Sequence, residues 1–348
     1  MRALTPILIL VVACSGKAAD SSGDTRPDDY RYAAPYSATH SFHTVDGNPV
    51  LVWAPTRQGG GEYSLARITS SSAREQTITE LVLAGNNGCP GDNYPGARDN
   101  DIVSGEWPLV AMSHCHACTA SSLATIAMTL ARWGHVVVAP SHEGDTLFDA
   151  LDGTGMALDT DTLAMRVGQL DAAIGAARNG ELGMEVTDEL MLVGHSFGAV
   201  TVGMRAQLEP VPTVFLGAPA DNPLLPGVDA AKLTAPTMWM LLEEDNSIGE
   251  LGNSLIESNF AEVSGDSRLV RFPDAGHWSV SDIAGLTETT MPGCGEGTRQ
   301  DGSGETFAYP DPWDATWHTS VVVTTALAGG LDQLDTLDGW ETFTVESR

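Results

Sequence analysis

Residues 190–200 read Leu190-Met191-Leu192-Val193-Gly194-His195-Ser196-Phe197-Gly198-Ala199-Val200. The four apolar residues at the start predict a buried strand, and the residues after the second glycine predict a helix. Between them stands a Gly-x-Ser-x-Gly turn, in which the glycines let the backbone crowd around an exposed serine hydroxyl. A chain with 37 glycines can contain such a pattern by chance. The strand before the turn and the helix after it make the match specific, so Ser196 is predicted to be a catalytic nucleophile.

From Trp107 onward, apolar strands alternate with helices on both sides of this turn, and short strand-like runs separated by Gly, Ser and Asn clusters precede them. We expect strands over residues 49–53, 77–83, 108–112, 135–140, 190–193, 213–216, 237–242 and 268–272, and helices over residues 122–133, 161–179 and 318–333. Strands that are apolar throughout and alternate with helices are typical of a parallel sheet covered on both faces. The expected fold class is therefore α/β, with a mostly parallel, doubly wound sheet whose ligands bind at the carboxyl ends of the strands.

A serine nucleophile needs a histidine base, and the base needs an acid that orients it. His277 comes directly after the expected strand at 268–272 and is the best placed of the nine histidines. His195 and His142 are expected to pack within loops or behind the catalytic residues. We therefore predict that His277 is the base.

Two aspartates are candidates for the acid. Asp245 follows the expected strand at 237–242, and Asp221 follows the strand before it, at 213–216. Either strand end can bring a carboxylate to the imidazole, so only geometry decides between them. We favour Asp245, because its strand comes just before the one that leads to His277. The adjacent Glu243 and Glu244 are expected to be solvated.

Two backbone N–H groups are needed to stabilise the oxyanion that forms when serine attacks a carbonyl. The residue after the nucleophile, Phe197, supplies the first. The second should come from the Ser-His-Cys-His-Ala-Cys loop at 113–118, and His116 is the predicted donor. The cysteines and histidines of this loop cannot easily surround a tetrahedral zinc ion without ligands from elsewhere, so we expect no metal site.

Residues 113–145 and the Gly-His-Ser-Phe-Gly turn resemble the platelet-activating-factor acetylhydrolase and predicted dienelactone hydrolase group of the α/β-hydrolase superfamily. Residues 235–248 are similar instead to bacterial polyester hydrolases of the cutinase type. The resemblance covers about residues 50–333 and implies the α/β-hydrolase fold. It also implies hydrolysis of a carboxylic ester through an acyl-enzyme, without a metal or an organic cofactor.

The chain departs from these groups at three places. Cys115 and Ala117 stand where the acetylhydrolases have glycine in the oxyanion loop. The acetylhydrolases take their acid from the earlier strand end, where this chain has Asp221. True dienelactone hydrolases use a cysteine nucleophile, and Ser196 argues against that activity.

The N-terminus has the features of an export signal. Arg2 supplies a positive charge, and residues 3–13 are an almost unbroken apolar run that is too short to span a bilayer as a helix. The ending Val11-Val12-Ala13-Cys14 is similar to the lipobox of bacterial lipoproteins, in which the cysteine is acylated and becomes the mature N-terminus. An ordinary cleaved signal peptide with an incidental cysteine is the alternative.

This reading divides the chain into three parts. Residues 1–13 are the expected signal peptide, residues 14–30 are acylated Cys14 and a flexible tether of small polar residues, and residues 31–348 are one catalytic domain. Membrane attachment would go through Cys14. Ser15 after the cysteine indicates, by its resemblance to such lipoproteins, the outer membrane or cell surface of a bacterium, with a periplasmic or secreted protein as the alternative.

Export would place the remaining cysteines in an oxidising compartment. Cys89, Cys115, Cys118 and Cys294 can pair in three ways, and the sequence does not choose among them. We expect two disulfides.

The charge balance restricts the partners. The chain has 17 basic and 46 acidic residues, a formal charge of −29, and the acidic residues are spread along the sequence. Such a surface repels phosphate backbones, so nucleic acid is not an expected partner. We expect a monomer that acts on a small-molecule or lipid-like ester. The alternatives are a catalytically silent surface-binding lipoprotein that kept the fold, and a peptidase or acyltransferase on the same fold.

Overall fold

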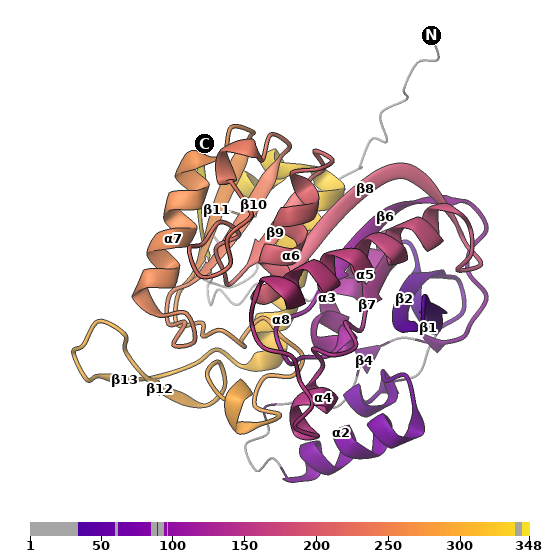
Figure 1. The fold of residues 1–348 in the computed structure, drawn as a ribbon, viewed down its shortest axis with the longest axis horizontal. Coiled ribbons are helices and arrows are strands. Elements are labelled where there is room, and N and C mark those ends of the chain that lie inside the picture. The colour runs from indigo at the N-terminus through magenta and orange to yellow at the C-terminus, as the bar shows by residue number, and fades with distance from the viewer. Residues whose placement is uncertain (1–33, 60–61, 85–88, 90–93, 96, 338–342) are drawn as a thin grey trace, which may run out of the picture. The chain divides into compact units, whose positions relative to one another are not determined.

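The computed structural model describes residues 34–59, 62–84, 89, 94–95, 97–337 and 343–348. These residues form a sheet of ten strands in the spatial order β14-β11-β10-β9-β8-β6-β7-β2-β1-β5 (Figure 1). The strands are β1 (Ser37–Val45), β2 (Asn48–Thr56), β5 (Ala97–Arg98), β6 (Glu106–Ser113), β7 (Val136–Pro140), β8 (Glu185–His195), β9 (Thr213–Leu216), β10 (Thr237–Leu242), β11 (Ser267–Phe272) and β14 (Thr344–Ser347).

Neighbouring strands from β7 through β6, β8, β9 and β10 to β11 run parallel. At the edges, β2 is antiparallel to β7 and β1, and β14 is antiparallel to β11. The carboxyl ends of the parallel strands therefore meet along one edge of the sheet, which is where such folds place their ligands. The predicted α/β class with a mostly parallel sheet is confirmed.

Helices cover both faces of the sheet (Figure 1). One face carries α3 (Ala124–Arg132) and α8 (Pro312–Thr324), and the other carries α5 (Thr160–Arg178), α6 (Phe197–Ala206) and α7 (Gly249–Glu262). Along β6, Val110 and Met112 pack toward the first face, whereas Leu109 and Ala111 pack toward the second. This alternation is the period of two that a strand buried between two layers requires.

Shorter elements lie outside this core. They are helices α2 (Ser72–Ala84) and α4 (Leu147–Leu151), the 3-10 helices Leu65–Arg67, Ala120–Leu123, Ala230–Lys232, Glu288–Thr290 and Leu331–Leu337, the π-helix Thr325–Gly329, and the strand pairs β3 (Glu62–Tyr63) with β4 (Tyr94–Pro95) and β12 (Glu296–Thr298) with β13 (Thr306–Ala308). Within the described ranges, no helix combines the length and the apolar character needed to cross a membrane.

The strand predicted at residues 77–83 was wrong, because this segment lies within helix α2. The helix begins after Ser71, whose side chain accepts the backbone N–H of Arg74, as a helix N-cap does. Thr77 and Thr79 each donate their hydroxyl to the carbonyl oxygen four residues earlier. Strand propensity of β-branched residues is a weak preference, and here the cap and the helical hydrogen bonds override it.

The last helix begins before the predicted residue 318. The carboxylate of Asp311 accepts the backbone N–H of Trp313 at 3.0 Å and that of Asp314 at 3.4 Å, and Pro312 occupies the first turn. This cap and the fixed φ of proline start the helix at its observed residue.

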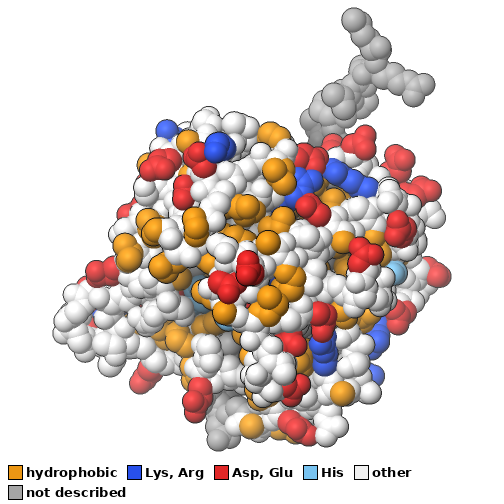
Figure 2. All heavy atoms as spheres, viewed as in Figure 1, with side chains coloured by type: hydrophobic (Ala, Val, Ile, Leu, Met, Phe, Trp, Pro, Cys, Tyr) orange, Lys and Arg blue, Asp and Glu red, His pale blue; other side chains and the backbone are white. Residues whose placement is uncertain are grey.

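The two expected disulfides form between Cys89 and Cys294 and between Cys115 and Cys118. The sequence left this pairing open. Cys14 and the predicted signal peptide lie outside the described residues. On the face drawn in Figure 2, acidic side chains are scattered rather than gathered in one block, as their spread along the sequence suggests.

Candidate active site

The turn after β8 holds Ser196 in an unusual backbone conformation, with φ 56° and ψ −122°. Left-handed φ in a residue with a side chain is strained, and it is found where the surrounding structure enforces it. A Cβ atom on Gly194 would collide with the carbonyl oxygen of Gly198, and one on Gly198 would collide with the carbonyl oxygen of Ser113. The two glycines therefore let the turn pack directly against the end of β6, and they leave Ser196 partly exposed.

Three side chains from three strand ends meet at this turn. His277 Nε2 lies 2.8 Å from Ser196 Oγ, and His277 Nδ1 lies 2.7 Å from Asp245 Oδ2. The other carboxylate oxygen of Asp245 accepts the backbone N–H groups of Ser247 at 2.9 Å and Ile248 at 3.1 Å. Asp245 is fully buried and His277 nearly so. In the tautomer with its proton on Nδ1, His277 presents an unprotonated Nε2 to the serine hydroxyl.

Asp221, the alternative acid, lies elsewhere. Its carboxylate accepts the backbone N–H of Ala230 at 3.2 Å, and its own backbone is bonded on both sides to the Asn259 side chain. Within the part of the chain that the structure describes, Asp221 makes no hydrogen bond or ion pair with His277. Of the two candidates, only Asp245 is in a position to orient the imidazole.

His195, inside the Gly-x-Ser-x-Gly turn, supports the base from behind. Its Nε2 lies 2.9 Å from the carbonyl oxygen of His277. Burial, with the neighbouring His277 adding to it, holds the pKa of His195 well below its usual 6.5, so the ring is neutral. With its proton on Nε2, the neutral His195 ring donates to the His277 carbonyl oxygen and so fixes the His277 backbone. This agrees with the packing role expected for His195.

Glu244 differs from the expectation. It is only 8% exposed, not solvated, whereas Glu243 is exposed. The Glu244 carboxylate accepts Nη1 of Arg299 at 2.9 Å and the backbone N–H of Gln300 at 3.0 Å. Arg299 and Gln300 belong to the connection between β12 and β13, so this hairpin holds the loop that carries Asp245. A partner 55 residues away leaves no local signal in the sequence.

The predicted oxyanion donors lie on neighbouring loops. The rings of His116 and Phe197 contact each other edge to face, with centroids 6.2 Å apart. Among the described residues, neither of the two backbone N–H groups has a hydrogen-bond acceptor. The Cys115–Cys118 disulfide closes the loop around His116, and Ala117 adopts a φ of 52°.

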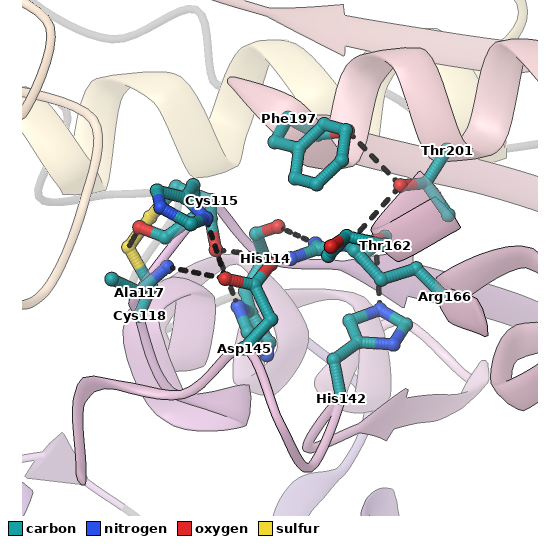
Figure 3. Close-up of polar contacts among 12 residues, drawn as sticks. His114, Cys115, Ala117, Cys118, His142, Asp145, Thr162, Arg166, Phe197 and Thr201 are labelled. Atoms are coloured by element: carbon teal, nitrogen blue, oxygen red, sulfur yellow. Dashed lines mark hydrogen bonds and ion pairs between the residues drawn. A yellow bond between two sulfur atoms is a disulfide. The ribbon is translucent and has the colours of Figure 1, made fainter. Parts of the chain in front are cut away.

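Beneath this loop lies an ion pair that the sequence did not indicate. Arg166 of α5 is fully buried, and its Nη1 lies 2.5 Å from Asp145 Oδ2 (Figure 3). Burial lowers the pKa of Arg166 to about 10 against the opposing effect of Asp145, so the guanidinium stays charged at pH 7. Burial raises the pKa of Asp145, but its hydrogen bond to His116 and the charge of Arg166 outweigh this and lower it overall.

Two further histidines surround this ion pair. His142 Nε2 lies 2.9 Å from Ser113 Oγ, and its Nδ1 lies 3.1 Å from the side-chain oxygen of Gln169. Burial and the charge of Arg166 lower the pKa of His142 well below 6.5 and that of His114 to about 4. Both rings are therefore neutral at pH 7. Among the described residues, no group of three or more His, Cys, Asp or Glu side chains is placed to hold a metal ion.

Comparisons with known proteins extend the description of the fold. No protein-family model and no curated protein matches the chain. Among solved structures, the chain is similar to a ferulic acid esterase from Streptomyces cinnamoneus, with a TM-score of 0.61 over 85% of this chain and 91% of that chain, at 13% sequence identity. At that identity the likeness shows the fold alone, and the chain has the α/β-hydrolase fold. Since 649 solved chains match, and one fold hosts many activities, the site has to decide the function.

Proposed function

We propose that this protein is a serine carboxylic ester hydrolase. The observation that carries the proposal is the hydrogen-bonded series Ser196–His277–Asp245, with distances of 2.8 and 2.7 Å. A serine hydroxyl is a weak nucleophile until a neighbouring base takes its proton, and a buried carboxylate holds that base in the correct tautomer. The similarity to a solved esterase supports the same class of reaction.

In the proposed reaction, His277 takes the Ser196 proton as Oγ attacks the ester carbonyl. The N–H groups of Phe197 and His116 bind the oxyanion of the tetrahedral intermediate. His277 then gives its proton to the leaving alcohol, which departs and leaves the acyl group on Ser196. Water attacks this acyl-enzyme as His277 takes one of its protons, and His277 then gives that proton to Ser196 Oγ as the C–O bond to the serine breaks and the carboxylic acid is released.

The substrate is proposed to be a small or lipid-like ester. The resemblance to the platelet-activating-factor acetylhydrolase group supports testing a lipid-like ester, and the solved esterase supports testing a phenolic acid ester. A panel of p-nitrophenyl esters, an acetylated lipid and a feruloyl ester ranks these classes by kcat/KM. Including an amide substrate and an acceptor alcohol separates hydrolysis from peptidase and acyltransferase activity.

Labelling with a fluorophosphonate probe tests the proposal directly. We expect the wild type to be labelled and Ser196→Ala to lose labelling, with kcat reduced about 10⁶-fold. Ser258→Ala, which removes an exposed hydroxyl on α7, serves as the control and should behave as the wild type. Clear ester hydrolysis by Ser196→Ala would refute the nucleophile. A wild-type protein inert to the probe would favour the silent binding lipoprotein instead.

We also propose that the mature protein is a monomer anchored to a membrane through acylated Cys14. In a bacterial host, metabolic labelling with an alkyne fatty acid should mark the wild type and not Cys14→Ser, which should leave the membrane fraction. Equal labelling of both proteins would refute the anchor. Light scattering on the detergent-solubilised protein gives the oligomeric state.

A further inference from the structure

The Arg166 side chain uses its whole hydrogen-bonding capacity under the oxyanion loop. A guanidinium offers five N–H groups, and Arg166 has five distinct acceptors (Figure 3). Nη1 bonds Cys115 O at 3.3 Å and Asp145 Oδ2 at 2.5 Å, Nη2 bonds Ser113 Oγ at 3.1 Å and His114 O, and Nε bonds Thr201 Oγ1 at 3.3 Å.

Three of these acceptors lie on consecutive residues, 113 to 115, where β6 ends and the loop begins. The carbonyl of Cys115 is turned toward the guanidinium, and His114 Nδ1 lies 2.7 Å from the same oxygen. In a trans peptide the C=O and N–H point in opposite directions. The N–H of His116, which belongs to the same peptide group, therefore points away from Arg166.

The other contacts of Arg166 reach the helix of the nucleophile. Thr201 lies on α6, and the guanidinium carbon sits 4.7 Å from the centroid of the Phe197 ring. The Thr201 hydroxyl in turn donates to the carbonyl oxygen of Phe197 at 3.0 Å. One rigid planar group thus connects the loop of His116 with the first turn of the helix that carries the Phe197 N–H.

Asp145 completes the connection. It balances the charge of Arg166, accepts the backbone N–H of Ala117 at 3.2 Å and lies 2.5 Å from His116 Nδ1. The peptide that carries the His116 N–H is therefore fixed from both sides, by Arg166 at its carbonyl and by Asp145 at the following residue.

We propose that Arg166 is a positioning residue for the oxyanion hole. It orients the Cys115–His116 peptide so that the His116 N–H and the Phe197 N–H can bind the same oxyanion. This inference rests on the proposed function, because an oxyanion hole matters only where Ser196 attacks a carbonyl. A lysine cannot replace this group, because an ammonium is a point charge and lacks the planar fork that reaches both α6 and the loop.

The test compares Arg166→Lys with Arg205→Lys. Arg205 is also largely buried and ion-paired, with Asp171 and Glu209, but it lies at the far end of α6 from Ser196. Active enzyme is counted by fluorophosphonate titration, so that misfolded protein does not enter kcat. The measurements are kcat and KM on a p-nitrophenyl ester, and the affinity for a trifluoromethyl ketone, whose serine adduct carries the oxyanion.

Removing one oxyanion donor typically lowers kcat 10²- to 10³-fold. We expect Arg166→Lys to lose about 10²-fold in kcat with KM within twofold, and trifluoromethyl ketone affinity to fall in parallel. Arg205→Lys should match the wild type. The inference is overturned if Arg166→Lys keeps kcat within threefold of Arg205→Lys, if only KM changes, or if ketone affinity is unchanged.

Thr201→Val provides a test that does not depend on the folding of Arg166→Lys. Valine keeps the shape of threonine but removes both the acceptor of Arg166 Nε and the donor to the Phe197 carbonyl oxygen. We expect kcat and ketone affinity to fall together by about tenfold, the effect of one misplaced hydrogen bond; unchanged values would count against the inference.

A wild type that neither reacts with the fluorophosphonate nor cleaves esters would overturn the proposed function and this inference together. An active wild type with normal variants would overturn the inference alone.

Discussion

Two buried carboxylates lie at different strand ends near the turn that carries Ser196. Asp245 follows β10 and pairs with His277, whereas Asp145 follows β7 and pairs with Arg166. Both are almost completely excluded from solvent, and both also accept backbone N–H groups of their own or a neighbouring loop. The difference lies in the partner, because an imidazole exchanges its proton near neutral pH and a guanidinium keeps it.

Because their partners differ, the two buried carboxylates are suited to different roles. A carboxylate beside an imidazole can support proton transfer, and a carboxylate beside a guanidinium can fix a loop against a helix.

Among substitutions of the residues around Ser196, the largest effect on kcat is expected at Asp245. Asp245→Asn keeps the shape of the side chain but favours the wrong tautomer of His277, so kcat should fall about 10⁴-fold while thermal stability changes little. Asp221→Asn is the control, since the Asp221 carboxylate bonds the Ala230 N–H and not His277. An Asp221→Asn variant that loses as much activity as Asp245→Asn would show that the two acids are assigned the wrong way round.

Asp145→Asn should instead lower the free energy of unfolding strongly and kcat less than Asp245→Asn does. It leaves the Arg166 charge buried without its counter-ion, which costs about 3–5 kcal/mol in the free energy of unfolding. Activity should fall by less than in Asp245→Asn, because the amide still has an oxygen that accepts from Arg166. Urea unfolding measures the first quantity and kcat the second. A stable Asp145→Asn protein would contradict the structural role given to this ion pair.

The neutral histidines around Arg166 give the third prediction, on pH. The pKa of His114 is about 4 in the folded protein and 6.5 when unfolded, so the unfolded chain binds the extra proton between these values. Stability from this residue is therefore complete above pH 6.5 and lost as the pH falls toward 4. Between pH 7 and 4.5 the wild type should lose about 2 kcal/mol more than His114→Gln. An equal loss in both proteins would contradict it.

The smallest effect is expected at His195. Phenylalanine in its place removes the donor to the His277 carbonyl, and we expect kcat to fall about tenfold, the effect of one hydrogen bond. The control is His135→Phe, because His135 is also buried and its ring also bonds a backbone carbonyl, that of Leu130. Equal effects of the two substitutions on kcat would show that His195 only packs.

The sequence could predict those parts of the site that follow from local pattern and strand order. Ser196, His277 and Asp245 each come directly after an apolar strand, and a parallel sheet brings such strand ends together. The identity of the acid still needed geometry, because Asp221 satisfies the same rule.

What the sequence could not show depends on distant partners. Arg166 lies in the middle of a helix, where an arginine usually faces solvent. The backbone carbonyls that accept its hydrogen bonds belong to residues more than 50 positions earlier in the chain. The error at 77–83 had a different, local origin, since the N-cap at Ser71 outweighs the strand propensity of the residues that follow. Glu244 was misjudged because Arg299 is far along the chain.

The saturation of Arg166 has a consequence for how such a protein can evolve. A guanidinium with five N–H donors and five acceptors has no unused donor, and a replacement side chain that makes only some of these bonds leaves acceptors unpaired. Loss of the Asp145 carboxylate, the Arg166 guanidinium or the Thr201 hydroxyl alone leaves an unpaired charge, donor or acceptor in the buried site. Among descendants of a common ancestor these positions should be inherited as a linked set, retained together or exchanged together.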